Sequence, residues 1–203
     1  MLAALAARSS SRSSDRSGAA EELRLRDDGG HGTQLQSAPP PDGYAMNRVG
    51  SSLVERTIYE VMGGAEAVLA LAEAWHKRCL ADPILAHAFE GGIHPHHTER
   101  LAAYWSEQLG GPDTYSVSIS DYSHVVQAHS GNGPHEQMDG RAVASFVLAL
   151  DDVGISSDPR LRFQLIAWFT WATAMLNHRW STPDDVPSGL PLPSWDWDGT
   201  EGW

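Results

Sequence analysis

The stretch Tyr122-Ser-His-Val-Val-Gln-Ala-His129-Ser-Gly-Asn-Gly133 decides the fold of this chain, because a short helix-forming run ends there in an imidazole and two glycines. It follows Leu109-Gly110-Gly111-Pro112, where glycine and proline end a helix. His129 stands eighteen residues after Gly111, and two valines give the run an apolar side. A neutral imidazole on a short helix with apolar backing suits the proximal side of a haem iron. We therefore take His129 as a candidate iron ligand.

Apolar residues recur at helical spacing on both sides of this stretch, and no strand pattern competes with them. Helices are predicted over about Leu53–Met62, Glu66–Leu80, Pro95–Leu109 and Pro134–Asp152, and Asp158 is predicted to cap a last helix. A short turn is predicted at Ile84–Phe89 and a loop from Pro112 to Ser120. Residues three or four apart predict the buried faces, namely Val68, Leu71, Ala72, Trp75 and Cys79, then Met138, Ala142, Ser145, Phe146 and Ala149, and finally Leu161, Leu165, Trp168, Phe169, Ala172 and Leu176. Short helices broken by glycines, followed by two long ones, favour a globin-like packing around a cavity over a symmetric four-helix bundle.

The composition narrows the classes of function. With 203 residues and 41% apolar residues, the chain can bury one core, so one folded domain is expected. The net charge is −12 and Lys77 is the only lysine, which makes nucleic acid and anionic membranes unsuitable partners. No apolar run approaches the roughly 20 residues that span a bilayer. The single Cys79 excludes an internal disulfide and a Cys-x-x-Cys-His haem attachment site, and it suits a reducing compartment such as the cytoplasm.

The two ends of the chain differ from its centre. Residues 1–50 are polar, rich in Ser, Arg and Gly, and contain Pro39-Pro40-Pro41, which predicts a disordered N-terminal extension. Residues 51–180 carry the helical pattern and form the predicted domain. Residues 181–203 make a tail rich in Pro, Asp and Trp. Three tryptophans are too many large aromatic residues for a wholly solvated tail, so part of it is expected to pack on the body or on a partner.

Several motifs, taken in order, resemble the truncated haemoglobins, closest to their second group in actinobacteria. The motifs are Gly63-Gly64, Leu109-Gly110-Gly111-Pro112-Asp-Thr-Tyr115 and the spacing to His129, and the likeness covers Leu53 to Leu176. The resemblance implies an all-α, two-over-two helical sandwich that holds haem b without a covalent link. It also implies roles for individual residues, which are His129 as the proximal iron ligand, Phe89 stacking on the haem, Leu101 and Trp105 in the distal wall, and Arg100 paired with a haem propionate.

Three positions depart from the family pattern on the distal side, opposite the iron ligand. His76 stands where the second group usually carries tyrosine, Ala142 where it carries an aromatic residue such as tryptophan, and His97 where histidine is rare. Either imidazole could donate a hydrogen bond to a ligand on the iron or bind the iron directly, and the residues leave both alternatives open. On the proximal side, the second nitrogen of His129 is expected to donate to the backbone carbonyl of Val125 or a neighbour.

The function implied by this resemblance is the binding of O2, NO or related diatomic ligands, by a carrier, a sensor or a redox catalyst. Dioxygenation of NO and reduction of peroxide or nitrite all need an open distal site and a proton donor, which His76 or His97 could supply. The chain carries no reductase domain or flavin signature, so turnover is expected to need a separate electron-donating reductase.

The same residues also have simpler interpretations that involve no haem. His129 could be an ordinary helix-end residue whose charge suits the helix dipole, and His76 a surface residue beside Lys77. The run His94-Pro-His96-His97 could form a zinc site with Glu99. The alternative function is a cofactor-free helical interaction module whose Trp-rich tail binds a partner protein. A visible spectrum separates the two functions, because a Soret band indicates haem.

Overall fold

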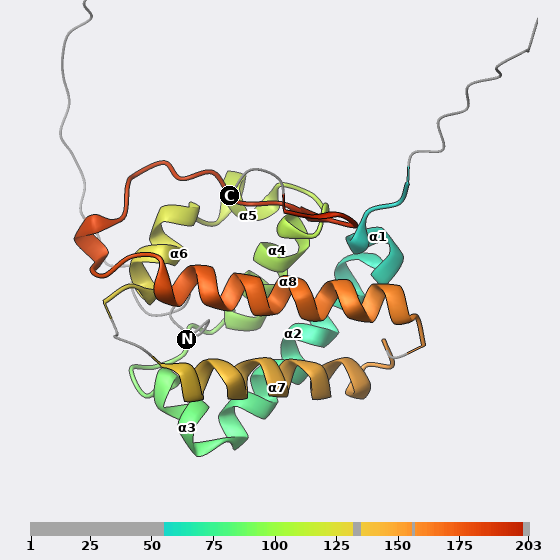
Figure 1. Ribbon diagram of the computed structural model, residues 1–203, viewed down its shortest axis with the longest axis horizontal. Coiled ribbons are helices and arrows are strands. Elements are labelled where there is room, and N and C mark those ends of the chain that lie inside the picture. Colours follow the sequence, from blue (N-terminus) through green and yellow to red (C-terminus); the bar gives the residue numbers. More distant parts are fainter. Residues whose placement is uncertain (1–54, 132–134, 156, 201–203) are drawn as a thin grey trace, which may run out of the picture. The chain divides into compact units, whose positions relative to one another are not determined.

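The computed structural model describes residues 55–131, 135–155 and 157–200, and the predicted disordered extension over residues 1–50 lies outside them. The described chain is helical apart from one very short pair of strands (Figure 1). The longer helices are α2 (Gly64–Ala81), α4 (His97–Gln108), α7 (Glu136–Asp152) and α8 (Pro159–His178). The shorter elements are α1 (Ile58–Met62), α3 (Pro83–Ala86), η2 (His87–Phe89), α5 (Thr114–Ser118), α6 (Tyr122–His129), η3 (Pro183–Asp185), β1 (Trp195–Asp196) and β2 (Gly199–Thr200).

The long helices form two layers, which confirms the expected all-α, two-over-two sandwich. Helix α2 packs on α4 in one layer, α7 packs on α8 in the other, and α2 also contacts α7. In Figure 1, α7 and α8 cross the front of the molecule side by side, with α2 behind them. The short α6 contacts α8 near one end of the sandwich. The described residues all belong to one compact unit.

Aromatic side chains fill the centre of the sandwich. Trp105 of α4 contacts four other rings edge to face, with ring centroids 5.6–5.8 Å apart, and these rings belong to Trp75, Phe146, Trp168 and Phe169. Phe146 and Phe169 stack with their centroids 4.0 Å apart, which joins α7 to α8. Each such pair contributes about 0.5–1.5 kcal/mol beyond the area it buries. Trp75, Trp105 and Trp168 are therefore core residues, as predicted, whereas Trp171 is only partly buried and contacts Trp195 of the tail.

The predicted buried faces of α2 and α8 are confirmed, since every residue named for them is buried. The prediction for α7 is wrong at Ser145, which is only half-buried, and it omits Leu150, which is fully buried. The stripe on α7 advances in steps of four from Ala142 through Phe146, and the next step reaches Leu150. Ser145 lies one position to the side of that stripe.

Side-chain caps set the starts of two short helices. The first helix begins at Ile58, later than the predicted start at Leu53, which lies outside the described residues. Thr57 and Glu60 form a capping box, in which each side chain accepts from the other residue's backbone N–H, at 3.2 and 3.0 Å. The predicted turn after Asp82 is also helical, because the Asp82 carboxylate accepts from the Ile84 N–H at 2.9 Å and caps α3.

The close packing of Thr57 and Tyr59 on the end of α4 explains the glycine pair that follows this helix. Gly110 has a φ of +87°, and a Cβ there would lie 2.8 Å from the Cβ of Thr57. A Cβ on Gly111 would lie 2.7 Å from the carbonyl oxygen of Ser106 and 2.9 Å from the ring of Tyr59. A residue with a side chain fits at neither position. The pair therefore allows α1 to pack directly against the end of α4.

The structure contains regular elements in two segments for which none is predicted. The predicted loop from Pro112 to Ser120 contains α5, because Tyr115 is 1% exposed and packs edge to face on Tyr104 with centroids 5.2 Å apart. A second feature is the short antiparallel pair of β1 and β2, which lies within the tail, where no element is predicted. Helix α5 depends on the packing of Tyr115, and the strand pair depends on the packing of the Trp-rich tail. Neither feature produces a periodic pattern in the sequence.

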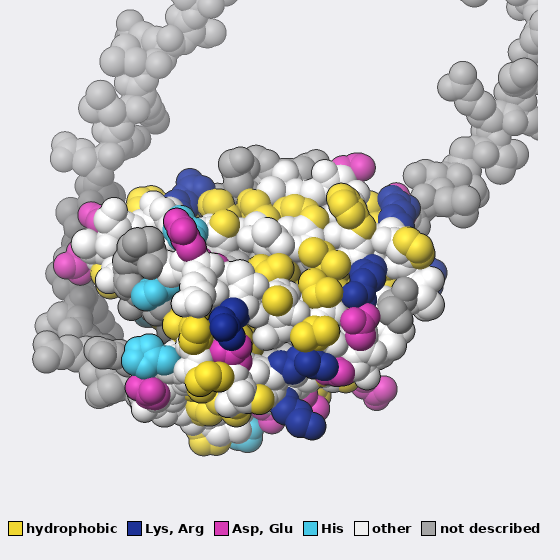
Figure 2. All heavy atoms as spheres, turned by 60° about the horizontal axis from the view of Figure 1, so that its bottom comes forward, with side chains coloured by type: hydrophobic (Ala, Val, Ile, Leu, Met, Phe, Trp, Pro, Cys, Tyr) yellow, Lys and Arg dark blue, Asp and Glu magenta, His cyan; other side chains and the backbone are white. Residues whose placement is uncertain are grey.

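Charged residues of both signs share the surface. Figure 2 shows basic side chains next to acidic ones on one face, with hydrophobic side chains between them. Arg78 pairs with Asp152 at 2.6 Å, and Arg141 pairs with Asp82 at 2.6 Å, so α7 is linked to α2 and to the turn before α3. Exposed pairs of this kind contribute about 0–1 kcal/mol each. In the described part of the chain, no helix is long and apolar enough to cross a bilayer.

Candidate functional site

Helix α6 carries His129 at its C-terminal end. Asp121 caps the helix, since its carboxylate accepts from the His124 N–H at 3.0 Å. His129 is 1% exposed, and its ring Nδ1 lies 2.6 Å from the carbonyl oxygen of Val125, one turn earlier. This carbonyl is the acceptor that the sequence analysis expects. Because a carbonyl only accepts, Nδ1 carries the proton and Nε2 keeps a lone pair, which is the form of imidazole that binds a metal.

Three rings meet where α2, η2 and α4 adjoin. His76 of α2 lies 4.7 Å from His97 of α4, measured between ring centroids. Phe89 of η2 lies 4.9 Å from His76 and 5.8 Å from His97. We call these residues the His76–Phe89–His97 cluster. The structure thus brings together three predicted site residues that lie on separate elements of the chain.

The imidazoles of this cluster lack hydrogen-bond partners among the described residues. Both ring nitrogens of His97 and Nε2 of His76 are buried without one, and His97 is only 2% exposed. Burial lowers the pKa of His97 to about 4, and it also lowers the pKa of His76, so both rings are neutral at pH 7. Leaving a buried polar group unpaired costs about 1–3 kcal/mol. A pair of such groups is typical of a site that binds a polar ligand.

The other predicted residues of this side lie on α4. Leu101 is fully buried. Arg100 is half-buried, and its Nε has no hydrogen-bond partner among the residues that the structure describes. Trp105 is 1% exposed and lies in the aromatic core. The place of Trp105 in a distal wall, and the pairing of Arg100 with a propionate, stay predictions.

Trp75 has a positioning contact that the sequence analysis missed. It is predicted only as a core residue, yet its indole Nε1 donates to the carbonyl oxygen of Ala142 at 3.1 Å. This buried bond ties α2 to α7 directly beside His76. A buried indole N–H usually finds an acceptor, which is a signal in the sequence, but packing between distant helices decides which acceptor that is. Ala142 is also the position where the resemblance expects tryptophan.

The run His94-Pro-His96-His97 gives no geometric support to the zinc interpretation. Among the described residues, no group of three or more His, Cys, Asp or Glu side chains is placed to hold a metal ion. His96 is exposed, with its Nδ1 3.4 Å from Oε1 of Glu99, whereas His97 is buried. Neighbours at a helix start point to different faces, which keeps these side chains apart.

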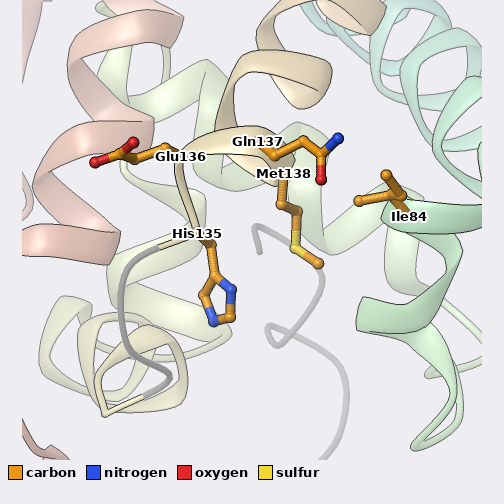
Figure 3. Close-up of a pocket in the computed structure, with 5 residues that line it drawn as sticks. All are labelled: Ile84, His135, Glu136, Gln137 and Met138. Atoms are coloured by element: carbon orange, nitrogen blue, oxygen red, sulfur yellow. The ribbon is translucent and has the colours of Figure 1, made fainter.

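A surface pocket of about 450 Å³ lies between α3 and the start of α7 (Figure 3). Its lining residues are Ile84, His135, Glu136, Gln137 and Met138. Figure 3 shows His135 and Met138 projecting to the same side, with Glu136 directed away from them. The pocket contains no predicted site residue, and the chain next to His135, residues 132–134, lies outside the described residues. We assign it no function.

Comparison with known proteins identifies the family. The model of the bacterial-like globins matches residues 57–167. The chain belongs to this globin family. A group 1 truncated haemoglobin from Tetrahymena pyriformis is 26% identical over 101 residues, covering 50% of this globin and 79% of the relative. A thermostable haemoglobin from the actinobacterium Thermobifida fusca superimposes with a TM-score of 0.53 at 23% identity, over 66% of this globin and 100% of that chain. A group II truncated haemoglobin from Bacillus anthracis gives a TM-score of 0.54 at 15% identity, over 61% and 92% of the two chains.

The resemblance to the truncated haemoglobins is confirmed for family and fold, and membership implies haem binding. The residues present fit that cofactor. His129 is a buried imidazole whose proton is directed to the Val125 carbonyl, which suits one axial nitrogen ligand. The buried, unpaired nitrogens of His76 and His97 suit a polar ligand.

Proposed function

We propose that this globin binds haem b non-covalently, with His129 as the axial ligand of the iron. The contact of 2.6 Å between His129 Nδ1 and the Val125 carbonyl carries the proposal, because it holds a buried neutral imidazole in one orientation. Metal-ligating imidazoles almost always donate their other N–H to a carbonyl, a carboxylate or water. When bound, haem supplies a site for diatomic gases and for one-electron chemistry.

The His76–Phe89–His97 cluster forms the distal side in this proposal. The neutral imidazoles of His76 and His97 would donate through their N–H groups to a bound diatomic ligand such as O2 or NO, which would accept through its negatively polarised oxygen. A hydrogen bond to a charged partner contributes about 1.5–3 kcal/mol, which slows ligand dissociation about tenfold to hundredfold. Phe89 excludes water and offers an aromatic surface to the macrocycle. Arg100, whose Nε is unpaired within the described residues, pairs with a propionate.

The protonation state of His97 favours ligand binding over acid-assisted redox chemistry. A pKa of about 4 leaves almost none of the imidazole protonated at pH 7, so His97 is an inefficient general acid there. A neutral ring still donates a hydrogen bond. Detoxification of NO or peroxide would require a further proton donor, together with electrons from a separate reductase.

Titration of the purified apoprotein with hemin, followed by visible absorbance, tests the cofactor and its ligand. The wild type is expected to give a Soret band at one hemin per chain, and His129→Ala is expected to lose stable haem retention. His124→Ala is the matched control, because His124 lies on the same helix with a side chain 71% exposed, and it should bind haem normally. A normal haem spectrum from His129→Ala would assign the iron to another residue. A wild type without a Soret band would favour the cofactor-free interaction module.

Stopped-flow kinetics of ligand release test the distal side. His76→Ala and His97→Ala are expected to retain haem and to release O2 about tenfold to hundredfold faster than the wild type. His87→Ala, with a side chain 71% exposed, should release it at the wild-type rate. Unchanged release from both cluster variants would remove the cluster from the proposal.

A further inference from the structure

Helix α6 is too short to hold its own position. It spans the 8 residues Tyr122–His129, and isolated helices shorter than about 12–15 residues are marginal in water. Its buried residues include Ser123, Val125 and His129, so packing against the rest of the chain decides its orientation. Its neighbours are α8 and the 3-10 helix η3. The segment that contains η3 is therefore part of the support of His129.

The chain after α8 reaches both ends of α6. We call residues 181–200 the C-terminal strap, and Figure 1 shows it in red, running from beside α6 across to the side of α1. At the end of α6, a Cβ on Gly131 would lie 3.0 Å from Cδ of Pro183, so η3 lies directly against the turn after His129. At the start of α6, the Leu190 N–H donates to Oγ of Ser123 at 3.0 Å. Ser123 is 4% exposed, so this bond is shielded from water.

The far end of the strap is anchored away from α6. The Trp195 indole donates to Oε1 of Gln164 on α8 at 3.1 Å, and Nε2 of Gln164 donates to the Trp197 carbonyl at 2.6 Å. The Trp197 indole donates to the Arg56 carbonyl at 2.7 Å, and the guanidinium of Arg160 lies 4.3 Å from the centre of its ring. Gln164 thus satisfies two polar groups of the strap at once.

The centre of the strap is also held. Thr182 and Asp185 form a capping box around η3, and Val186 is buried in the core at 6% exposure. A segment anchored in the core, on α8 and at Arg56 restricts the motion of any helix beneath it, because α6 cannot tilt without breaking a strap contact. The strap therefore limits the movement of His129 as well.

We propose that the C-terminal strap braces α6 and that Ser123 is a positioning residue for His129, acting through the Leu190 N–H. The proposal rests on the proposed role of His129 as the iron ligand. Ser123 touches neither the iron nor its ligand in this scheme. It acts by holding the start of a helix whose last residue binds the metal.

Full-chain variants test this proposal with two independent measurements. Ser123→Ala removes the acceptor on α6, and Gln164→Leu removes the remote anchor without altering a residue of α6. Ser188→Ala is the matched control, because Ser188 is an exposed strap residue. Hydrogen exchange of the α6 amides is measured on the apoprotein, and hemin transfer to excess apomyoglobin is measured on the haem-loaded protein. Resonance Raman spectra of the ferrous protein report the iron–histidine stretching band.

Ser123→Ala is expected to speed both α6 amide exchange and hemin loss about threefold to tenfold, as the loss of one hydrogen bond implies. Gln164→Leu should act in the same direction, and Ser123→Thr, which keeps the hydroxyl, should restore wild-type exchange. A shift of the iron–histidine band in Ser123→Ala would separate positioning from a general loss of stability. Exchange and hemin loss within twofold of the wild type in both variants, with an unmoved band, would overturn the proposal. A wild type that binds no haem would instead refute the proposed function, and α6 exchange would still decide whether the strap braces the helix.

Discussion

Replacement of His97 with leucine is expected to stabilise the apoprotein by about 1–3 kcal/mol at pH 7, the cost of a buried polar group without a partner. The imidazole is 2% exposed, and neither nitrogen has a hydrogen-bond partner among the described residues. Leucine has a similar size and carries no polar atom, so it removes that cost without opening a large cavity. The feature that suits His97 to a ligand site therefore weakens the fold when no ligand is present.

The same residue should make the apoprotein sensitive to acid. Burial is the main cause that lowers the pKa of His97 from 6.5 to about 4, aided by electrostatic repulsion from Arg100 and from the protonated forms of His76 and His94, and opposed by Glu99. Below pH 6.5 the unfolded chain takes up a proton at this imidazole, whereas the folded chain does so only as the pH nears 4. The free energy of unfolding therefore falls through that window, by about 2 kcal/mol at pH 5 and about 3 kcal/mol in all. Above the window the residue contributes no pH dependence.

Urea unfolding of the apoprotein, followed by far-UV circular dichroism at pH 7 and pH 5, measures both effects. His97→Leu should be more stable than the wild type at pH 7 and should lose less stability on acidification. His87→Leu serves as the control, because its side chain is 71% exposed and its stability should stay within about 0.5 kcal/mol of the wild type. A His97→Leu protein that is less stable at pH 7 and equally sensitive to acid would refute the argument from unpaired burial.

Three other expectations concern the scaffold. Gly111→Ala should lower the free energy of unfolding by about 1–3 kcal/mol, because the new Cβ would lie 2.7 Å from a carbonyl oxygen. Gly140→Ala should raise the free energy of unfolding by about 0.5–1 kcal/mol, because a Cβ on this helical glycine meets nothing within 4 Å. Thermal unfolding of the two variants measures both effects. Asp158→Ala should cost about 1 kcal/mol in the same assay, since its carboxylate accepts two backbone N–H groups at 2.9 and 3.2 Å where α8 begins. Cys79 should react with a thiol reagent only after unfolding, because it is 1% exposed and burial raises its pKa to about 12. Rapid labelling of Cys79 in the native protein would contradict its placement.

The helical framework could be predicted where the signal is local. Asp158 followed by Pro159 marks the start of α8, and the structure shows the cap. The capping box of Thr57 and Glu60 is an equally local signal, and it accounts for the start of α1 at Ile58 rather than at Leu53. Helix α5 was not readable in this way, because the burial of Tyr115 against another helix maintains it.

The candidate site likewise has local features that could be predicted and contacts between helices that could not. The bond from His129 to the Val125 carbonyl could be predicted, because a helical side chain leans over the turn before it and reaches the carbonyl four residues back. Both histidines of the cluster could be named from the resemblance, but their contact at 4.7 Å could not, since His76 and His97 belong to different helices. The absence of partners for their nitrogens within the described residues is likewise a property of the packing.

Amino-acid order alone settled where the long helices lie, the apolar faces of α2 and α8, and which imidazole lies at the end of a short helix, because these features depend on neighbours within a few residues. Only the packed chain decided that two imidazoles would be buried together, that Trp75 would bond to α7, and that the strap would reach Ser123 from 67 residues away. Contacts of that range depend on how whole helices lie against one another, and no local pattern encodes their geometry.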